Sequence, residues 1–204
     1  MKEGVVKKAR GPLPTQSKNK ALMISAEGFK GPDVYRAIAG RAKFRADDYY
    51  DFIVSHCNTD QPDFRSDGHL EIYVSLAAFV CEVYLKSLIF NANAETLFLK
   101  YPDGKKRLID HSLFDLYKKL ESLNADGCKY VDLIANGTSD FIGKLKSISN
   151  YYNHYRYDFE LDEEVIEYTF VFSLMEKLSA VTDEVDYIKS MEIVQKADGS
   201  ILLS

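Results

Sequence analysis

The sequence lacks the features of secreted, metal-binding and membrane-spanning proteins. It holds only three cysteines, Cys57, Cys81 and Cys128, and an odd, widely spaced set suits neither a disulfide framework nor a CxxC zinc motif. Glu82 and Lys86 interrupt the longest apolar run, so we expect no segment that crosses a bilayer. The basic N-terminus has no apolar core of a secretory signal. These absences predict a cytoplasmic protein without a metal, a cofactor or membrane contact.

The short motifs of several enzyme classes are also absent. The chain has no P-loop, no GxGxxG, no GxSxG, no HExxH and no paired-carboxylate signature. Its four histidines, His56, His69, His111 and His154, are dispersed and have no spacing that suits a shared metal ion. The sequence therefore carries no signature of nucleotide hydrolysis, α/β-hydrolase chemistry or metalloprotease chemistry.

The net charge of −5 conceals two unlike parts of the chain. Residues 1–20 carry six basic side chains and a single acidic one, so the remainder is strongly acidic. A basic arm of this kind either contacts nucleic acid or is a solvated tail, and the tail is the plainer interpretation. We therefore divide the chain into an N-terminal arm, 1–20, and one helical domain, 21–204.

Helical periodicity dominates the rest of the sequence. Between about 68 and 91, apolar residues recur every three or four positions and cover most of the helix circumference, as in the central helix of a bundle. Similar patterns indicate further helices at 32–57, 110–123, 128–137, 138–157 and 162–191. Because their connections are short, antiparallel neighbours are favoured. The predicted fold is an all-α, antiparallel up-and-down bundle of four to five main helices.

Turn and capping residues refine this outline. Apolar pieces on both sides of the tripeptide PDG predict a short β-hairpin at 96–109, because proline favours the first turn position and glycine the left-handed one. Helix starts are predicted where a side chain can accept early backbone N–H groups. Those residues are Asp110 for one helix and Thr138 or Ser139 for a later one.

Charged residues on the long apolar helix need partners of their own. Glu82 and Lys86 stand four residues apart in the order that favours a helical ion pair. Because buried charges are paired in folded proteins, we expect them to form a structural polar cluster with His111 or Arg156. For His111, the alternative to this structural role is a catalytic one. For the tyrosines of 151–157, base stacking is the alternative to core packing.

Three helix patterns occur in an order that resembles a known family. They are AAFVCEVYLKSLIF at 77–90, DHSLFDLYKKL at 110–120 and NHYRY at 153–157. In their order and spacing they are similar to the HEPN superfamily (higher eukaryotes and prokaryotes nucleotide-binding), and the resemblance covers about 68–180. The matching residues are Glu82, Leu85, Lys86, His111, Leu113, Leu116, Arg156 and Tyr157.

The resemblance implies a helical bundle that forms homodimers and contacts RNA or a nucleotide. Many members of the superfamily are metal-independent ribonucleases in toxin–antitoxin or phage-defence systems, where an antitoxin-like protein is the partner. Others are inactive binding or dimerisation modules. On this basis Glu82, Lys86, His111 and Tyr157 are candidate structural or binding residues.

The ribonuclease pair of the active members is missing from this sequence. Those members carry an arginine, then four to six residues, then a histidine, which supply a phosphate-binding fork and a group that titrates near neutrality. Before His154, the segment 147–149 offers only serine and isoleucine at that distance, and Asn150 stands closer. Arg156 follows the histidine, and two positions on a helix point about 200° apart. His154 and Arg156 would therefore converge only across a symmetric dimer.

Three hypotheses follow. The first is a HEPN-like binding or dimerisation module without the standard ribonuclease site, acting in a defence or stress-response system. The second is a metal-independent endoribonuclease with a rearranged site built from His154, Arg156 and Asn150. The third is an unrelated helical scaffold, in which the helices at 68–91 and 138–157 do not pack side by side.

Overall fold

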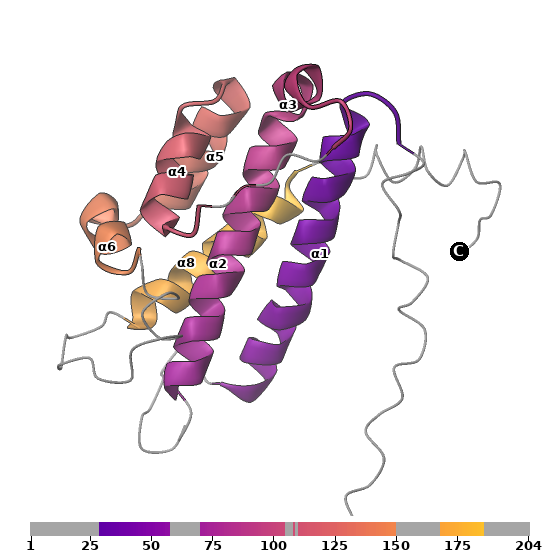
Figure 1. Ribbon diagram of the computed structural model, residues 1–204. Helices are drawn as coiled ribbons and strands as arrows, with labels where there is room; N and C mark the ends of the chain where they lie inside the picture. Colours follow the sequence, from indigo (N-terminus) through magenta and orange to yellow (C-terminus); the bar gives the residue numbers. More distant parts are fainter. Residues whose placement is uncertain (1–28, 58–69, 105–107, 109, 150–167, 186–204) are drawn as a thin grey trace, which may run out of the picture.

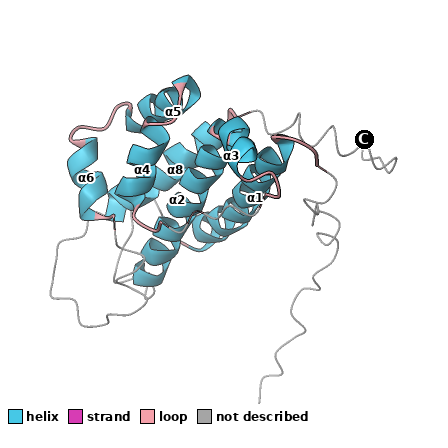
Figure 2. Ribbon diagram, turned by 45° about the horizontal axis from the view of Figure 1, so that its top comes forward, coloured by secondary structure: helices cyan, strands magenta, loops and turns pink. Residues whose placement is uncertain are grey.

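Seven helices and no strand make up the part of the chain that the structure describes (Figure 2). The computed structural model describes residues 29–57, 70–104, 108, 110–149 and 168–185. Its helices are α1 Asp33–His56, α2 Leu70–Ala92, α3 Ala94–Lys100, α4 Leu113–Glu121, α5 Ala125–Ala135, α6 Phe141–Ser147 and α8 Tyr168–Asp183. The predicted all-α fold class is confirmed, with more and shorter helices than the four to five expected.

Helix α2 is the centre of the assembly. It lies between α1 and α4, with α8 crossing it on another side, and it also packs against α3 and α5 (Figure 1). Val74, Ala78, Cys81, Leu85 and Leu88 are almost fully buried. Each large apolar side chain removed from water in this way stabilises the fold by about 1.5–3 kcal/mol. The helix that the sequence marked as central is therefore the one around which the others pack.

The composition of α2 bears on the expectation that no segment crosses a bilayer, which stays a prediction. Within it, Ile72–Ala92 is long and apolar enough to cross a membrane by length and composition, because two charges do not offset the apolar remainder. Of this window, 61% is buried inside the fold, as in the core helix of a soluble protein. One such helix is weak evidence for a membrane span.

Helices α1 and α2 form an antiparallel pair. The ring of Tyr35, near the start of α1, stacks on Phe90 near the end of α2 at 6.0 Å. At the opposite end of the pair, the ring centre of Phe52 on α1 lies 6.3 Å from that of Tyr73 on α2. Between them the Ser87 hydroxyl donates to the backbone carbonyl of Ala39 at 2.8 Å, so the two backbones approach closely where α1 carries a small residue.

The predicted β-hairpin at 96–109 is wrong in its first half. Residues that were expected to form a strand belong to helix α3, which buries Ala94 and Leu97. That three-residue spacing suits a helix packed against α1 and α2. The predicted turn does occur, because the Gly104 amide donates to the Tyr101 carbonyl at 3.1 Å and Gly104 has a φ of 69°. Residues 105–107 and 109 lie outside the described part.

Two predicted helix caps are also wrong. Helix α4 begins after Ser112 rather than Asp110, and the Ser112 hydroxyl accepts the Asp115 amide at 3.1 Å. Helix α6 begins after Asp140 rather than Thr138 or Ser139. Within the described residues α6 ends at Ser147, short of the predicted 138–157, while α8 lies inside the predicted 162–191.

A polar junction that runs from the buried Tyr84 to the exposed Asp183 joins α1, α2 and α8. The Tyr84 hydroxyl donates to Asp47 Oδ1 at 2.8 Å. Lys43 Nζ lies 2.7 Å from Asp47 Oδ2 and 2.7 Å from Asp183 Oδ1. Burial, together with these two carboxylates, raises the pKa of Tyr84. Each of the three helices therefore contributes a group to one network.

We expect Tyr84→Phe to lower the free energy of unfolding by about 1–2 kcal/mol, because Asp47 loses a buried donor. Urea denaturation of the full chain measures this change. Tyr73→Phe is the matched control, since the Tyr73 hydroxyl makes no hydrogen bond with the described residues. A Tyr84→Phe variant as stable as the control would contradict the structural role of the junction.

Alkaline pH is expected to destabilise the fold through Tyr117. Burial, then the nearby Glu121 and Asp132, raise the pKa of Tyr117 from 10.0 to about 12. Below pH 10 the Tyr117 hydroxyl keeps its proton in both the folded and the unfolded state. Above pH 10 the unfolded state loses this proton first. Stability therefore falls between pH 10 and about 12. Urea titrations should show a smaller fall for Tyr117→Phe, and an equal fall would contradict this assignment.

Candidate functional site

A buried carboxylate forms the centre of the candidate site. Glu82 lies in the middle of α2 and is 3% exposed. An ionised carboxylate in such a position is costly unless cations or hydrogen-bond donors surround it. Its presence on the most apolar helix of the chain therefore directs attention to its partners.

Two nitrogen groups contact the same oxygen of Glu82. Lys86 Nζ, one turn further along α2, lies 2.8 Å from Glu82 Oε1. His111 Nδ1, from the segment that precedes α4, lies 3.0 Å from the same atom. Side-chain exposure rises outward through the cluster, from 4% for Glu82 to 15% for Lys86 and 50% for His111. The cluster thus connects the core to the surface.

The position of His111 is set by the start of α4. Ser149, which follows α6, accepts the Phe114 amide through its hydroxyl at 2.9 Å, and its carbonyl accepts the Leu113 amide at 3.1 Å. The hydroxyls of Ser112 and Ser149 lie 2.7 Å apart. These bonds satisfy amides that a helix start leaves without intrahelical partners. They also fix the start of α4 directly after His111.

One oxygen of Glu82 has no donor among the residues that the structure describes. Glu82 Oε2 is buried and unsatisfied there, while Oε1 takes both contacts. A carboxylate can accept several hydrogen bonds, and a buried acceptor without one is costly. The cluster is therefore ready to receive one further donor.

The arrangement orients the imidazole of His111. When Nδ1 carries the proton it donates to Glu82, and Nε2 of this half-exposed side chain is then an acceptor. Lys86 stands next to it, since both bind one oxygen atom. Near the same helix start, Lys146 Nζ lies 5.0 Å from the centre of the Phe114 ring. Basic groups therefore lie around the first turn of α4 together with the acidic Asp110 and Asp115.

The structure brings together three of the predicted site residues, Glu82, Lys86 and His111. The others, Asn150, His154, Arg156 and Tyr157, lie outside the described residues, and Ser149 is the last described residue before them.

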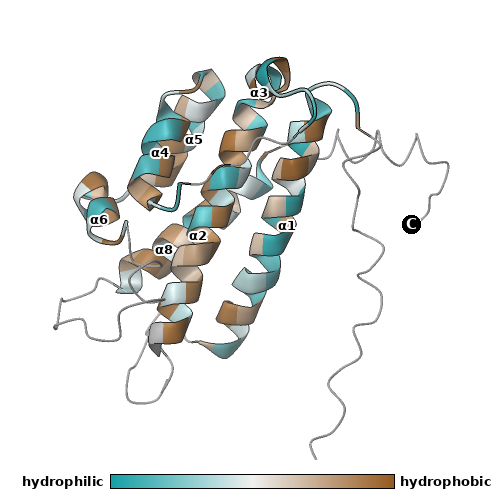
Figure 3. Ribbon diagram, in the orientation of Figure 1, coloured by the Kyte–Doolittle hydropathy of each residue, from teal (hydrophilic) through white to brown (hydrophobic). Residues whose placement is uncertain are grey.

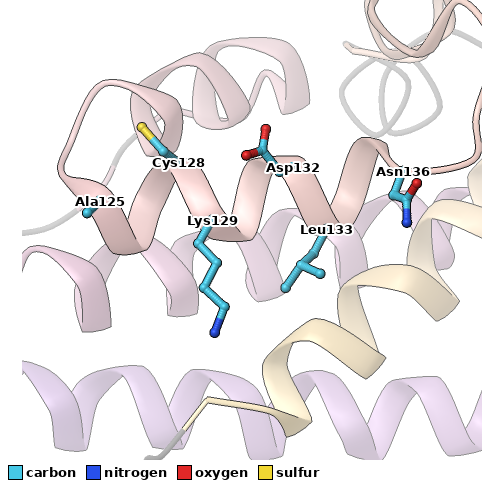
Figure 4. A pocket seen from close by; sticks show the side chains of 6 residues that line it. All are labelled: Ala125, Cys128, Lys129, Asp132, Leu133 and Asn136. Atoms are coloured by element: carbon cyan, nitrogen blue, oxygen red, sulfur yellow. The ribbon is translucent and has the colours of Figure 1, made fainter.

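A second surface feature, on α5, was not predicted from the sequence. It is an open depression of about 600 Å³. Its side chains diverge: Cys128 and Asp132 point one way while Lys129 and Leu133 point another (Figure 4). Because these groups do not converge on a common point, they do not build a site for a small ligand. Among the described residues no three His, Cys, Asp or Glu side chains gather as metal ligands.

No protein-family model matches the chain, and no curated protein and no solved structure is detectably similar to it.

We expect Glu82→Gln to lower the free energy of unfolding by about 2 kcal/mol, because Lys86 and His111 lose their shared anion. The matched control is Glu121→Gln, which removes a solvent-exposed ion pair with Lys118. Exposed pairs contribute little, so the control should change stability by less than about 0.5 kcal/mol. Urea denaturation compares the two, and equal effects would contradict a structural role for the cluster.

Proposed function

We propose that the chain is a HEPN-like helical module that binds RNA or a nucleotide and forms homodimers, without the standard ribonuclease pair. We place it in the cytoplasm, in a defence or stress-response system with an antitoxin-like protein partner. The proposal keeps the antiparallel up-and-down arrangement of the family as its expected fold. It rests on the resemblance of three helix patterns and on the contacts that their residues make.

The Glu82 cluster is the observation that carries this proposal. Glu82 and Lys86 come from the first helix pattern and His111 from the second, and one carboxylate oxygen joins them. Residues that match a family pattern and also meet in space support the resemblance more strongly than the spacing does. Packing of α4 on α2, which the cluster links, points the same way.

Binding agrees better than catalysis with the state of these groups. Both nitrogen groups are already engaged by Glu82, so neither Lys86 nor His111 Nδ1 is free to act on a substrate. The open depression on α5 contains none of the cluster residues. The half-exposed His111 instead offers a hydrogen-bonding group to a phosphate, and Lys146, whose Nζ lies over the Phe114 ring, offers a cationic one.

An unpaired oxygen of Glu82 suggests how the third pattern joins the other two. We propose that Arg156, which lies outside the described residues, is a further partner of this cluster, because Glu82 Oε2 has no donor among the described residues. A guanidinium can satisfy this oxygen and keep its remaining donors for a phosphate. Arg156 then acts as a positioning and binding residue rather than as a catalyst.

The alternative is a metal-independent endoribonuclease with a site around Asn150, His154 and Arg156. One observation favours it: a buried carboxylate orients the exposed imidazole of His111, which is a geometry suited to proton transfer. An unrelated scaffold is the remaining alternative. It is favoured by α6, which packs on α4 instead of forming a long helix beside α2.

We expect the purified chain to bind a labelled single-stranded RNA without cutting it, as measured by fluorescence anisotropy and by gel electrophoresis. Binding should weaken as salt rises, because phosphate contacts release counterions. The matched pair is His154→Ala and wild type, each with and without EDTA. RNA cleavage that EDTA does not inhibit and that His154→Ala abolishes would contradict the binding module and support the ribonuclease hypothesis. Absence of both cleavage and toxicity on expression would eliminate the ribonuclease, and absence of RNA binding would contradict our proposal.

A further inference from the structure

One face of α1 carries a regular row of exposed charged and aromatic side chains. Arg41, Arg45, Asp48 and Phe52 follow at spacings of four, three and four residues, which aligns them along one side of a helix. All four are exposed, and Phe52 is 46% exposed. Helix α1 lies at the edge of the described helices, away from α4 and α5, and hydrophilic and hydrophobic residues alternate along it (Figure 3).

The charges of this row have no partners in the described part of the chain. Arg41, Arg45 and Asp48 form no ion pair with another described residue, whereas Lys43 and Asp47 on the same helix are paired. Helix α1 instead packs on α2, α3 and α8 through other sides. The row is thus an organised surface that the described helices leave uncovered.

We propose that this face of α1 is the dimer interface, where α1 packs antiparallel against α1 of a second copy. A two-fold axis between positions 45 and 48 places Arg45 of each copy opposite Asp48 of the other. The same axis places Arg41 over the Phe52 ring of the other copy, as in a cation–π contact. Each contact occurs twice, because an interface of this symmetry is self-complementary. The inference rests on the proposed dimerisation and locates it.

Charge complementarity selects a second copy over the other occupants. The row runs from two cations to an anion and an aromatic ring, so an antiparallel copy of itself matches it at every position. The basic arm 1–20 would bring its positive charges against those of Arg41 and Arg45, which repel them. A nucleic acid would bring its negative phosphates against the negative Asp48. A single-helix seam is smaller than a standard protein interface, so the dimer should be weak, with a dissociation constant in the micromolar range.

Sedimentation velocity of the full chain from low to high micromolar concentration tests the interface. Arg45→Glu creates two like-charge contacts and should raise the dimer dissociation constant roughly tenfold or more. The double variant Arg45→Glu, Asp48→Arg exchanges the two charges and should restore the wild-type constant. Leu99→Asp, on α3 at an 82% exposed position outside the row, is the matched control and should leave it unchanged. Circular dichroism checks that each variant folds.

The outcomes separate the interface from the proposed function. A dimer that Arg45→Glu does not weaken overturns this interface, while dimerisation itself stands. A wild type that is monomeric at every concentration overturns both. A wild type that is monomeric, but dimerises when residues 1–20 are removed, would mean that the arm covers this face of α1. That result would also overturn the inference. Failure of the charge exchange to restore the dimer would show that Arg45 and Asp48 do not face each other.

Discussion

The arrangement of these helices depends on keeping a carboxylate inside the most apolar helix of the chain. Glu82 is 3% exposed, so its charge is tolerated only where donors reach it. Lys86 supplies one from the same helix, and this contact needs no other element. His111 supplies the second from the segment before α4, and it does so only when α4 lies against α2. The need of a single buried charge thereby helps to fix where the second half of the chain packs.

The Tyr84 junction performs the same task on another side of α2. Tyr84 follows Glu82 by two residues, so its side chain leaves the helix about 200° away. It contacts Asp47 of α1, and Lys43 extends the contact to Asp183 of α8. Apolar packing alone would allow neighbouring helices to slide, whereas hydrogen bonds demand specific distances and angles. Two polar anchors on different sides of α2 therefore give its neighbours a defined register.

Sequence reasoning succeeded where the determining contacts are local. The period of apolar residues gave α1 and α2, and the spacing of Glu82 and Lys86 gave their ion pair. It failed where a distant group decides the outcome. Ser112 caps α4 in place of Asp110 while its hydroxyl meets Ser149, which is 37 residues away. The Tyr84–Asp47 bond also spans 37 residues, and no pattern in the sequence announces it.

The same limit applies to the candidate site. Glu82, Lys86 and His111 were identifiable because a charge on an apolar helix demands a partner, and that rule needs no knowledge of the fold. Which of the cluster's groups remain available for binding is a different question, because it depends on exposure. Side-chain exposure rises from 4% at Glu82 to 50% at His111, so the imidazole is the group of this pair that solvent reaches. A group that must be both anchored and accessible is best placed at such a boundary, where a buried partner fixes its orientation and solvent admits the ligand.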